Sequence, residues 1–127
     1  MGCACIDIGG LDGDPARVLK DIFSIARKEH KCDECRRTIK IGEEYRYETF
    51  VCQGNFEVHK TCKDCNSIRK EMFCDTFYYG CILDEVQEYV QDVKGDVGED
   101  CLVELTVEAR AMLCEMIENV WRDDESN

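Results

Sequence analysis

The chain carries two short cysteine pairs, Cys32-Asp33-Glu34-Cys35 and Cys62-Lys63-Asp64-Cys65. Each pair places two thiolates on one tight turn, so two turns can close a tetrahedron of sulfur ligands around a single ion. The charged neighbours of these cysteines do not belong to an apolar core, which argues against four ordinary buried cysteines. The spacing therefore predicts a zinc site formed by Cys32, Cys35, Cys62 and Cys65, because zinc is the default ion for four thiolates.

An alternative ligand is His59, because His59-x2-Cys62 has the same spacing as the second cysteine pair. Together with the first pair it resembles the first zinc site of LIM domains. A LIM domain would use Cys65 to open a second site with another cysteine three residues later, where this chain has Ile68. The all-cysteine set is favoured because Cys65 would otherwise lie beside the metal without binding it. His59 is then a strand residue or a hydrogen-bond donor to the site.

The pattern around the cysteines predicts a knuckle, then a β-hairpin, then a helix. Residues 45–51 alternate as in a strand, Gln53-Gly54-Asn55 supply a turn, and residues 56–59 alternate on the return strand. From the second cysteine pair the pattern becomes helical through Met72, so this pair lies on the first turn of a helix. Knuckle, hairpin and ligand-bearing helix follow one another in the order of a treble clef.

Helical patterns flank this module on both sides. Asp14 as cap and Pro15 at the first position predict a helix that ends near residues 27–28. Its apolar stripe consists of Val18, Ile22, Ile25 and Ala26. After the module, a second helix and a third one from about residue 106 are separated by an acidic loop with Gly95 and Gly98. Their stripes are Ile82, Val86, Val90 and Val93, and then Ala109, Leu113, Met116 or Ile117, and Val120.

These elements predict a small α+β protein with one domain over its 127 residues. Residues 1–29 form an N-terminal segment and helix, residues 30–73 the treble-clef zinc module, and residues 74–127 an acidic helical lobe. No segment has the apolar core of a signal peptide or the length of a membrane span, so a cytoplasmic protein with reduced cysteines is expected.

Charge divides the chain into unlike parts. Residues 71–127 hold three Lys or Arg against sixteen Asp or Glu, whereas residues 30–70 hold nine against seven. Four thiolates with one zinc ion add two negative charges, which leaves the zinc module about neutral. Binding to a phosphate backbone needs an uncompensated basic surface, so nucleic acid is not expected as a direct ligand.

Seven of the eleven cysteines lie outside the two pairs. Cys3, Cys5, Cys74 and Cys81 are candidates for a second metal site that would tie the N-terminus to the segment after the zinc helix. Core packing is the other interpretation of these four. Cys52, Cys101 and Cys114 occupy strand or helix positions and are expected in the core.

Several stretches also resemble a known family. They are Ala26-Arg27-Lys28-Glu29-His30, Cys32-Asp33-Glu34-Cys35, residues 39–45 with Gly42-Glu43, and Lys60-Thr61-Cys62-Lys63-Asp64-Cys65. Over most of its length the chain is similar to small, uncharacterised phage and prophage proteins with one treble-clef zinc site. The resemblance implies that the matching four cysteines are the ligands, and Cys3, Cys5 and Phe73-Cys74 also match recurring segments. It implies no activity, but would place a phage-encoded protein in the host cytoplasm.

Catalysis is not expected, because a closed four-thiolate site has no open position for water. The chain has only two histidines, His30 and His59, and no phosphate-binding glycine loop or serine nucleophile elbow. The protein is expected to bind another macromolecule, most simply a host protein.

Two other functions stay open. In one, the acidic lobe imitates DNA phosphates and inhibits a nucleic-acid-binding host complex such as a bacterial defence system, in the manner of an anti-CRISPR protein. In the other, the protein is a purely structural zinc protein and its carboxylates only solvate helix faces, as the position of Glu85, Glu88 and Asp92 opposite the Ile82 stripe would allow. Phe77, Tyr78 and Tyr79 are candidate apolar anchors for a partner, with core packing as the alternative.

Overall fold

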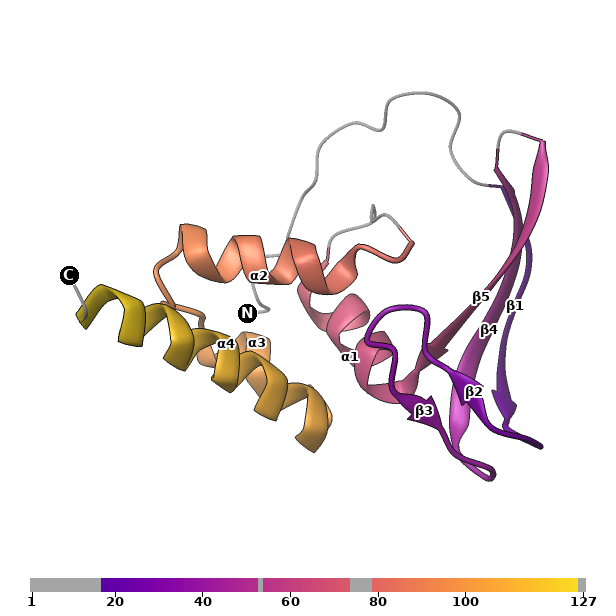
Figure 1. Ribbon diagram of the computed structural model, residues 1–127, viewed down its shortest axis with the longest axis horizontal. Coiled ribbons are helices and arrows are strands. Elements are labelled where there is room, and N and C mark those ends of the chain that lie inside the picture. The colour runs from indigo at the N-terminus through magenta and orange to yellow at the C-terminus, as the bar shows by residue number, and fades with distance from the viewer. Residues whose placement is uncertain (1–16, 53, 74–78, 126–127) are drawn as a thin grey trace.

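The computed structural model describes residues 17–52, 54–73 and 79–125. The described residues form a three-stranded antiparallel sheet, a two-stranded ribbon and a group of helices, which confirms the α+β class. Strands gather at one end of the molecule and α2 to α4 at the other, with α1 between them (Figure 1). The elements are β1 (Arg17–Ile25), β2 (His30–Lys31), β3 (Thr38–Ile39), β4 (Glu44–Cys52), β5 (Asn55–Cys62), α1 (Lys63–Met72), α2 (Ile82–Asp92), α3 (Glu99–Val103) and α4 (Val107–Glu125).

The helix predicted before the first cysteine pair is wrong, because residues 17–25 form strand β1. β1 pairs antiparallel with β4 and completes the sheet order β1-β4-β5. The helical stripe was ambiguous, since the segment is rich in Val, Ile and Phe, which also favour strands. The free edge of β4 offers this segment a hydrogen-bonding partner, and Arg46 forms a bidentate ion pair with Asp21 at 2.7 and 2.9 Å. Asp14 and Pro15 lie outside the described residues.

The predicted hairpin and the helix that follows it are confirmed. β4 and β5 pair from Tyr45 opposite Cys62 to Cys52 opposite Asn55, and Gly54 in the turn has a positive φ of 81°. α1 starts directly after β5 and packs on the sheet through polar contacts. Arg69 donates to Glu48 at 2.9 Å, and Arg46 donates to Asn66 at 2.9 Å.

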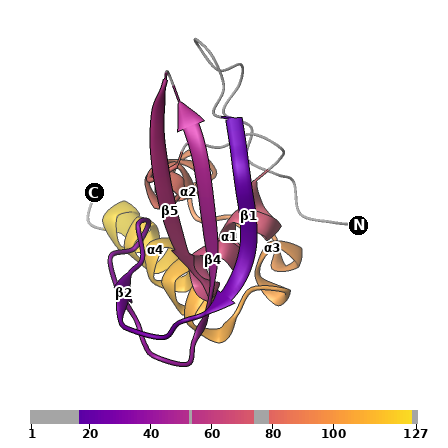
Figure 2. The same cartoon turned by 90° about the vertical axis from the view of Figure 1, so that its right-hand side faces the viewer.

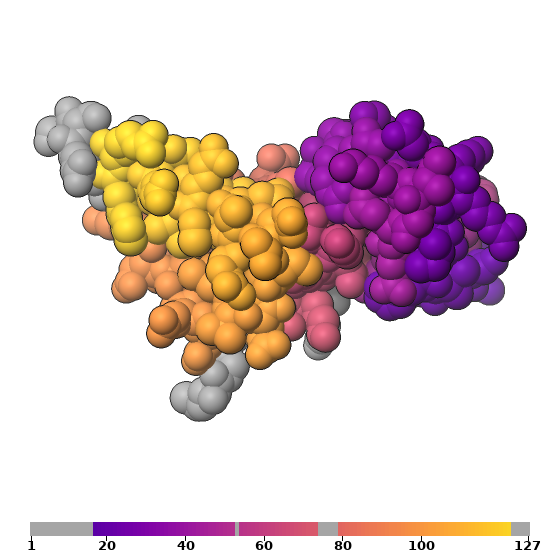
Figure 3. Space-filling model, turned by 90° about the horizontal axis from the view of Figure 1, so that it is seen from below, coloured from indigo at the N-terminus to yellow at the C-terminus, as the bar shows by residue number. Residues whose placement is uncertain are grey.

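The main hydrophobic core lies among α1, α2 and α4. The stripes predicted for α2 and α4 are buried at Ile82, Val86, Val90, Ala109, Leu113 and Ile117, whereas Met116 and Val120 are half-buried. α3 is a short helix in the segment predicted as an acidic loop, where Cys101 supplies its buried side chain. In the space-filling view the helical part and the strand part form two masses that meet at α1 (Figure 3). Within the described chain, no helix is both long and apolar enough to cross a bilayer.

A prediction concerns Gly95, which follows α2, donates its N–H to the carbonyl of Val90 at 2.9 Å and has a positive φ of 79°. The Trp121 indole donates to the carbonyl of Lys94 at 3.1 Å, and a Cβ on Gly95 would lie 2.9 Å from Cδ1 of that ring. Gly95→Ala is therefore expected to lower the free energy of unfolding by about 1–3 kcal/mol, from the left-handed backbone and the contact together. Gly98→Ala is the control, because Gly98 has φ −62° and open space around its Cα. Equal urea midpoints for the two variants would contradict this account.

Candidate metal centre

The four cysteines of the predicted site come together in one cluster. Their Sγ atoms all lie within 4.8 Å of one another, which could hold a metal ion. Cys32 and Cys35 come from the knuckle between β2 and β3, Cys62 ends β5, and Cys65 lies on the first turn of α1. Cys32, Cys62 and Cys65 are fully buried and Cys35 is half-buried. Two segments about thirty residues apart in the sequence are thus joined at one point.

The spacing of the sulfur atoms fits a tetrahedral ion. A tetrahedron with metal–sulfur distances of about 2.3 Å has edges of about 3.8 Å. The Sγ atoms of Cys35 and Cys62 are 3.8 Å apart. A disulfide bond has an S–S distance of about 2.05 Å. All four cysteines are free thiols. The 3.8 Å distance between Cys35 and Cys62 therefore matches an edge of such a tetrahedron, and every other pair of these sulfurs lies within 4.8 Å.

Backbone N–H groups point at two of the sulfurs. Glu34 and Cys62 donate to Sγ of Cys32 at 3.4 and 3.3 Å, and Cys65 donates to Sγ of Cys62 at 3.4 Å. The last of these bonds is also the N-cap of α1, so Cys62 caps the helix with the same atom that faces the cluster. Such donors stabilise thiolates, which are the form of cysteine that binds metals.

The crowding of the sulfurs perturbs their protonation. Hydrogen bonds from the Cys62 and Cys65 thiols lower the pKa of Cys32. The pKa of Cys62 rises to about 12, first through its contact with Cys32, and the pKa of Cys65 is raised for the same first reason. One thiolate is therefore favourable, whereas further thiolates repel it. Four thiolates at these distances need a cation among them.

His59 lies with the carboxylates of the knuckle and not among the sulfurs. It is a β5 residue, as one interpretation predicted, and its Nε2 is 2.9 Å from Oε2 of Glu34. The Glu34 side chain is completely buried and also accepts hydrogen bonds from the N–H groups of Gly80 at 2.8 Å and Ile82 at 3.1 Å. Glu34 thus connects the knuckle to β5 and to the start of α2.

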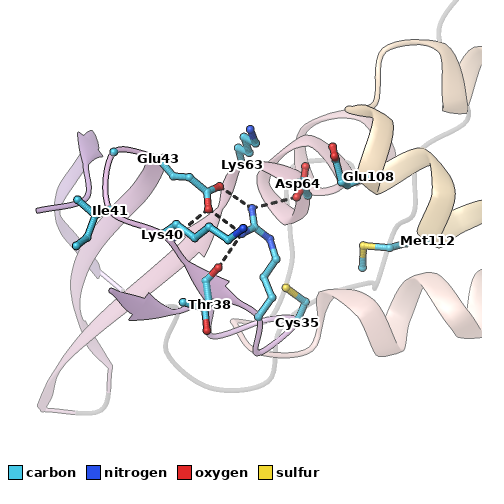
Figure 4. Close-up of a pocket in the computed structure, with 11 residues that line it drawn as sticks. Cys35, Thr38, Lys40, Ile41, Glu43, Lys63, Asp64, Glu108 and Met112 are labelled. Atoms are coloured by element: carbon cyan, nitrogen blue, oxygen red, sulfur yellow. Dashed lines mark hydrogen bonds and ion pairs between the residues drawn. The ribbon is translucent and has the colours of Figure 1, made fainter. Parts of the chain in front are cut away.

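A second group of polar contacts lies in a cleft of about 830 Å³ between the knuckle and α4 (Figure 4). Arg37 bridges Glu43 at 3.0 Å and Asp64 at 3.1 Å. The Arg37 guanidinium lowers the pKa of Glu43 to about 2, with help from the Lys40 N–H. The other oxygen of Asp64 accepts from the Thr106 hydroxyl at 2.7 Å, which connects the first turn of α1 to the start of α4.

The remaining cysteines do not form a second cluster within the described residues. Cys81 is a free and exposed thiol, and Cys3, Cys5 and Cys74 lie outside the described residues. Cys101 is buried as predicted, but it takes part in a disulfide, which the expectation of reduced cysteines did not include. Cys52 and Cys114 are half-buried free thiols.

Comparison of the chain with known protein families, with curated proteins and with solved structures finds no match.

Glu34 and Asp64 are the structurally important residues that sequence reasoning missed. Each lies between two paired cysteines, and its charge suggests exposure to solvent. Both side chains are buried, however, and both accept hydrogen bonds. The sequence signal that could have found them is their place within the four-residue cysteine turns, since a carboxylate beside a buried ligand needs donors of its own.

Proposed function

We propose that Cys32, Cys35, Cys62 and Cys65 hold one zinc ion and that residues 30–73 form a treble-clef module around it. The knuckle β2–β3, the hairpin β4–β5 and α1 follow in that order, and the ligands come from the knuckle and from the junction of β5 with α1. Four thiolates in a tetrahedron favour zinc over metals that prefer oxygen or imidazole ligands.

Such an ion has a structural role, because a closed four-sulfur shell leaves no position for water or substrate. The protein acts as a rigid scaffold that binds another protein. One observation carries this proposal, namely the number of large apolar side chains that the two faces of the sheet expose, since exposed apolar surface marks interaction sites. These residues are Val18, Leu19, Ile22, Phe23, Ile25, Phe56 and Val58. The resemblance to phage and prophage proteins favours a host protein as the partner.

Tyr79, one of the three candidate anchors, does not belong to this surface. The Tyr79 ring stacks on Phe50 with centroids 4.3 Å apart, and its hydroxyl donates to Glu48 at 2.9 Å. Tyr79 therefore packs between the sheet and the start of α2. Phe77 and Tyr78 lie outside the described residues.

A second candidate function is imitation of DNA by the helical lobe. Of the eleven Asp and Glu residues in the segment 79–122, all but Glu85 are exposed, and only three cations accompany them. Exposed carboxylates on rigid helices can occupy a phosphate-binding surface. The same charges also explain solubility, as expected for the solvent face opposite the buried α2 stripe.

Capture from a bacterial lysate at low and high salt tests these proposals. The zinc-loaded protein is expected to retain a protein through apolar contacts, and high salt should leave most of it bound. A partner that leaves at high salt and is displaced by added DNA would support imitation of DNA instead. If neither condition retains anything beyond what a Cys32→Ser variant retains, the binding function is contradicted.

A further inference from the structure

The three-stranded sheet has two faces of opposite character. Side chains directly opposite in antiparallel strands share a face, and successive side chains alternate between faces. Glu48 and Arg46 contact α1, so their rows form the inner face. All carboxylates of the three strands belong to these inner rows, because Asp21 pairs with Glu48, Glu57 pairs with Phe50, and Glu44 alternates with Arg46.

The outer face consists of four rows across β1, β4 and β5. In the row next to the knuckle, Ser24–Tyr45–Cys62, both Tyr45 and Cys62 are buried. The other three rows hold the exposed apolar side chains of this face, and they are Arg17–Val51–Phe56, Lys20–Thr49–Val58 and Ile22–Tyr47–Lys60. In Figure 2 the sheet is seen from this side, and the helices all lie behind it. Ile22 is 42% exposed, Phe56 62% and Val58 42%. About half of the surface of these three side chains is thus exposed to solvent.

Within the strands that the structure describes, the charged side chains of these three rows are all positive. Arg17, Lys20 and Lys60 form no ion pair with a carboxylate among the described residues. Lys20 lies over the Tyr47 ring at 5.8 Å, and Nζ of Lys60 is 3.3 Å from Nδ1 of His30. In a chain with a net charge of −12, these three rows of described residues thus hold cations and no carboxylate.

We propose that the outer face binds an acidic polypeptide segment, whose apolar side chains cover Ile22, Phe56 and Val58 while its carboxylates pair with Arg17, Lys20 and Lys60. This inference rests on the proposed binding function and specifies its surface and partner. Charge complementarity gives such a complex its specificity and on-rate, and the apolar contacts give it lifetime.

The composition of the face argues against its other occupants. Nucleic acid strands stack on aromatic rings, whereas the exposed apolar side chains here are mainly aliphatic, and the rest of the chain repels phosphates. A second copy docked face to face would place cations against cations. An acidic protein segment satisfies both the apolar and the charged part of the surface.

The test uses the zinc-loaded full chain and a displayed library of short random peptides. Enriched peptides are expected to contain more Asp, Glu and apolar residues than the library. Binding of the tightest peptide, measured by fluorescence anisotropy, should weaken by about tenfold or more in a Lys20→Glu, Lys60→Glu double variant and by a few-fold in Val58→Ser. Controls with the same changes elsewhere, Lys40→Glu with Lys70→Glu and Val107→Ser, should stay within about twofold.

The other outcomes overturn the inference in distinguishable ways. Enriched peptides without an excess of Asp and Glu would show that binding occurs on another surface. The same would follow if only the control substitutions changed the affinity. In both cases the proposed binding function would stand. A labelled oligothymidylate that binds the wild type and is lost in the Lys20, Lys60 variant would assign the face to nucleic acid. A dimer in sedimentation that Val58→Ser dissociates would assign it to a second copy. A library that gives no enrichment, together with an empty lysate capture, would contradict both proposals.

Discussion

Removal of the proposed zinc ion is expected to unfold the strand half of the protein. Zinc binding contributes about 10–16 kcal/mol in finger peptides, compared with a total stability of about 5–15 kcal/mol for a typical domain. Without the ion, four crowded thiols remain where the knuckle, β5 and α1 meet. A strong chelator should therefore abolish the dispersed amide NMR signals of β1, β4 and β5. Added zinc should restore them.

Cysteine variants separate the loss of the metal from the loss of a helix cap. Cys62→Ser keeps an oxygen that can accept the Cys65 N–H, since serine is itself a favoured N-cap residue. It is still expected to unfold the module because it removes a thiolate ligand. Cys114→Ser changes a half-buried thiol outside the cluster and should leave zinc binding unchanged. Native NMR spectra for Cys62→Ser after chelation would contradict the proposed role of the ion.

Acid should have the same effect as a chelator. Zinc binds the deprotonated thiolates, so binding releases protons and the affinity falls as the pH falls. The loss of structure on acidification should therefore follow zinc release, measured with a colorimetric zinc indicator.

Glu34→Ala is expected to lower the free energy of unfolding by about 2–5 kcal/mol, since each buried group left without a partner costs about 1–3 kcal/mol. The substitution would leave the N–H groups of Gly80 and Ile82 without their acceptor and His59 without its partner. It would thereby disconnect α2 from the knuckle. Urea unfolding of the zinc-loaded protein, followed by circular dichroism, measures the effect.

The matched control for this substitution is Glu44→Ala. Glu44 is an exposed carboxylate on β4, and its removal should change stability by less than about 0.5 kcal/mol. Glu34→Gln should fall between the two, because it keeps one acceptor oxygen. An equal urea midpoint for Glu34→Ala and the wild type would show that the buried contacts of Glu34 contribute nothing.

The sequence predicted the elements whose signals are local. Cysteine spacing placed the four sulfurs, and alternation placed β4 and β5. Most residues of the α2 and α4 stripes are buried as expected, whereas Val93, Met116 and Val120 are half-buried. The helix predicted from Pro15 to residues 27–28 rests on the helical spacing of Val18, Ile22 and Ile25, but residues 17–25 form β1. Their true conformation depends on pairing with β4, a tertiary contact that no local pattern contains.

The roles of Glu34 and Asp64 could not be predicted for a similar reason. Their partners are the start of α2 and the start of α4, which lie 42 or more residues away in the sequence. A carboxylate in a cysteine turn is usually solvated, and only the folded chain shows that N–H and hydroxyl donors surround these two. The outer face could not be predicted from the sequence either, because it forms only when β1 pairs with β4.

X-ray absorption at the zinc edge, on protein purified without added chelator, tests the metal centre most directly. The account predicts one zinc per chain with four sulfur neighbours at about 2.3 Å. A shell that contains a nitrogen at about 2.0–2.1 Å would bring His59 back as a ligand and contradict the all-sulfur site. A well-folded protein that contains no metal would contradict the account as a whole.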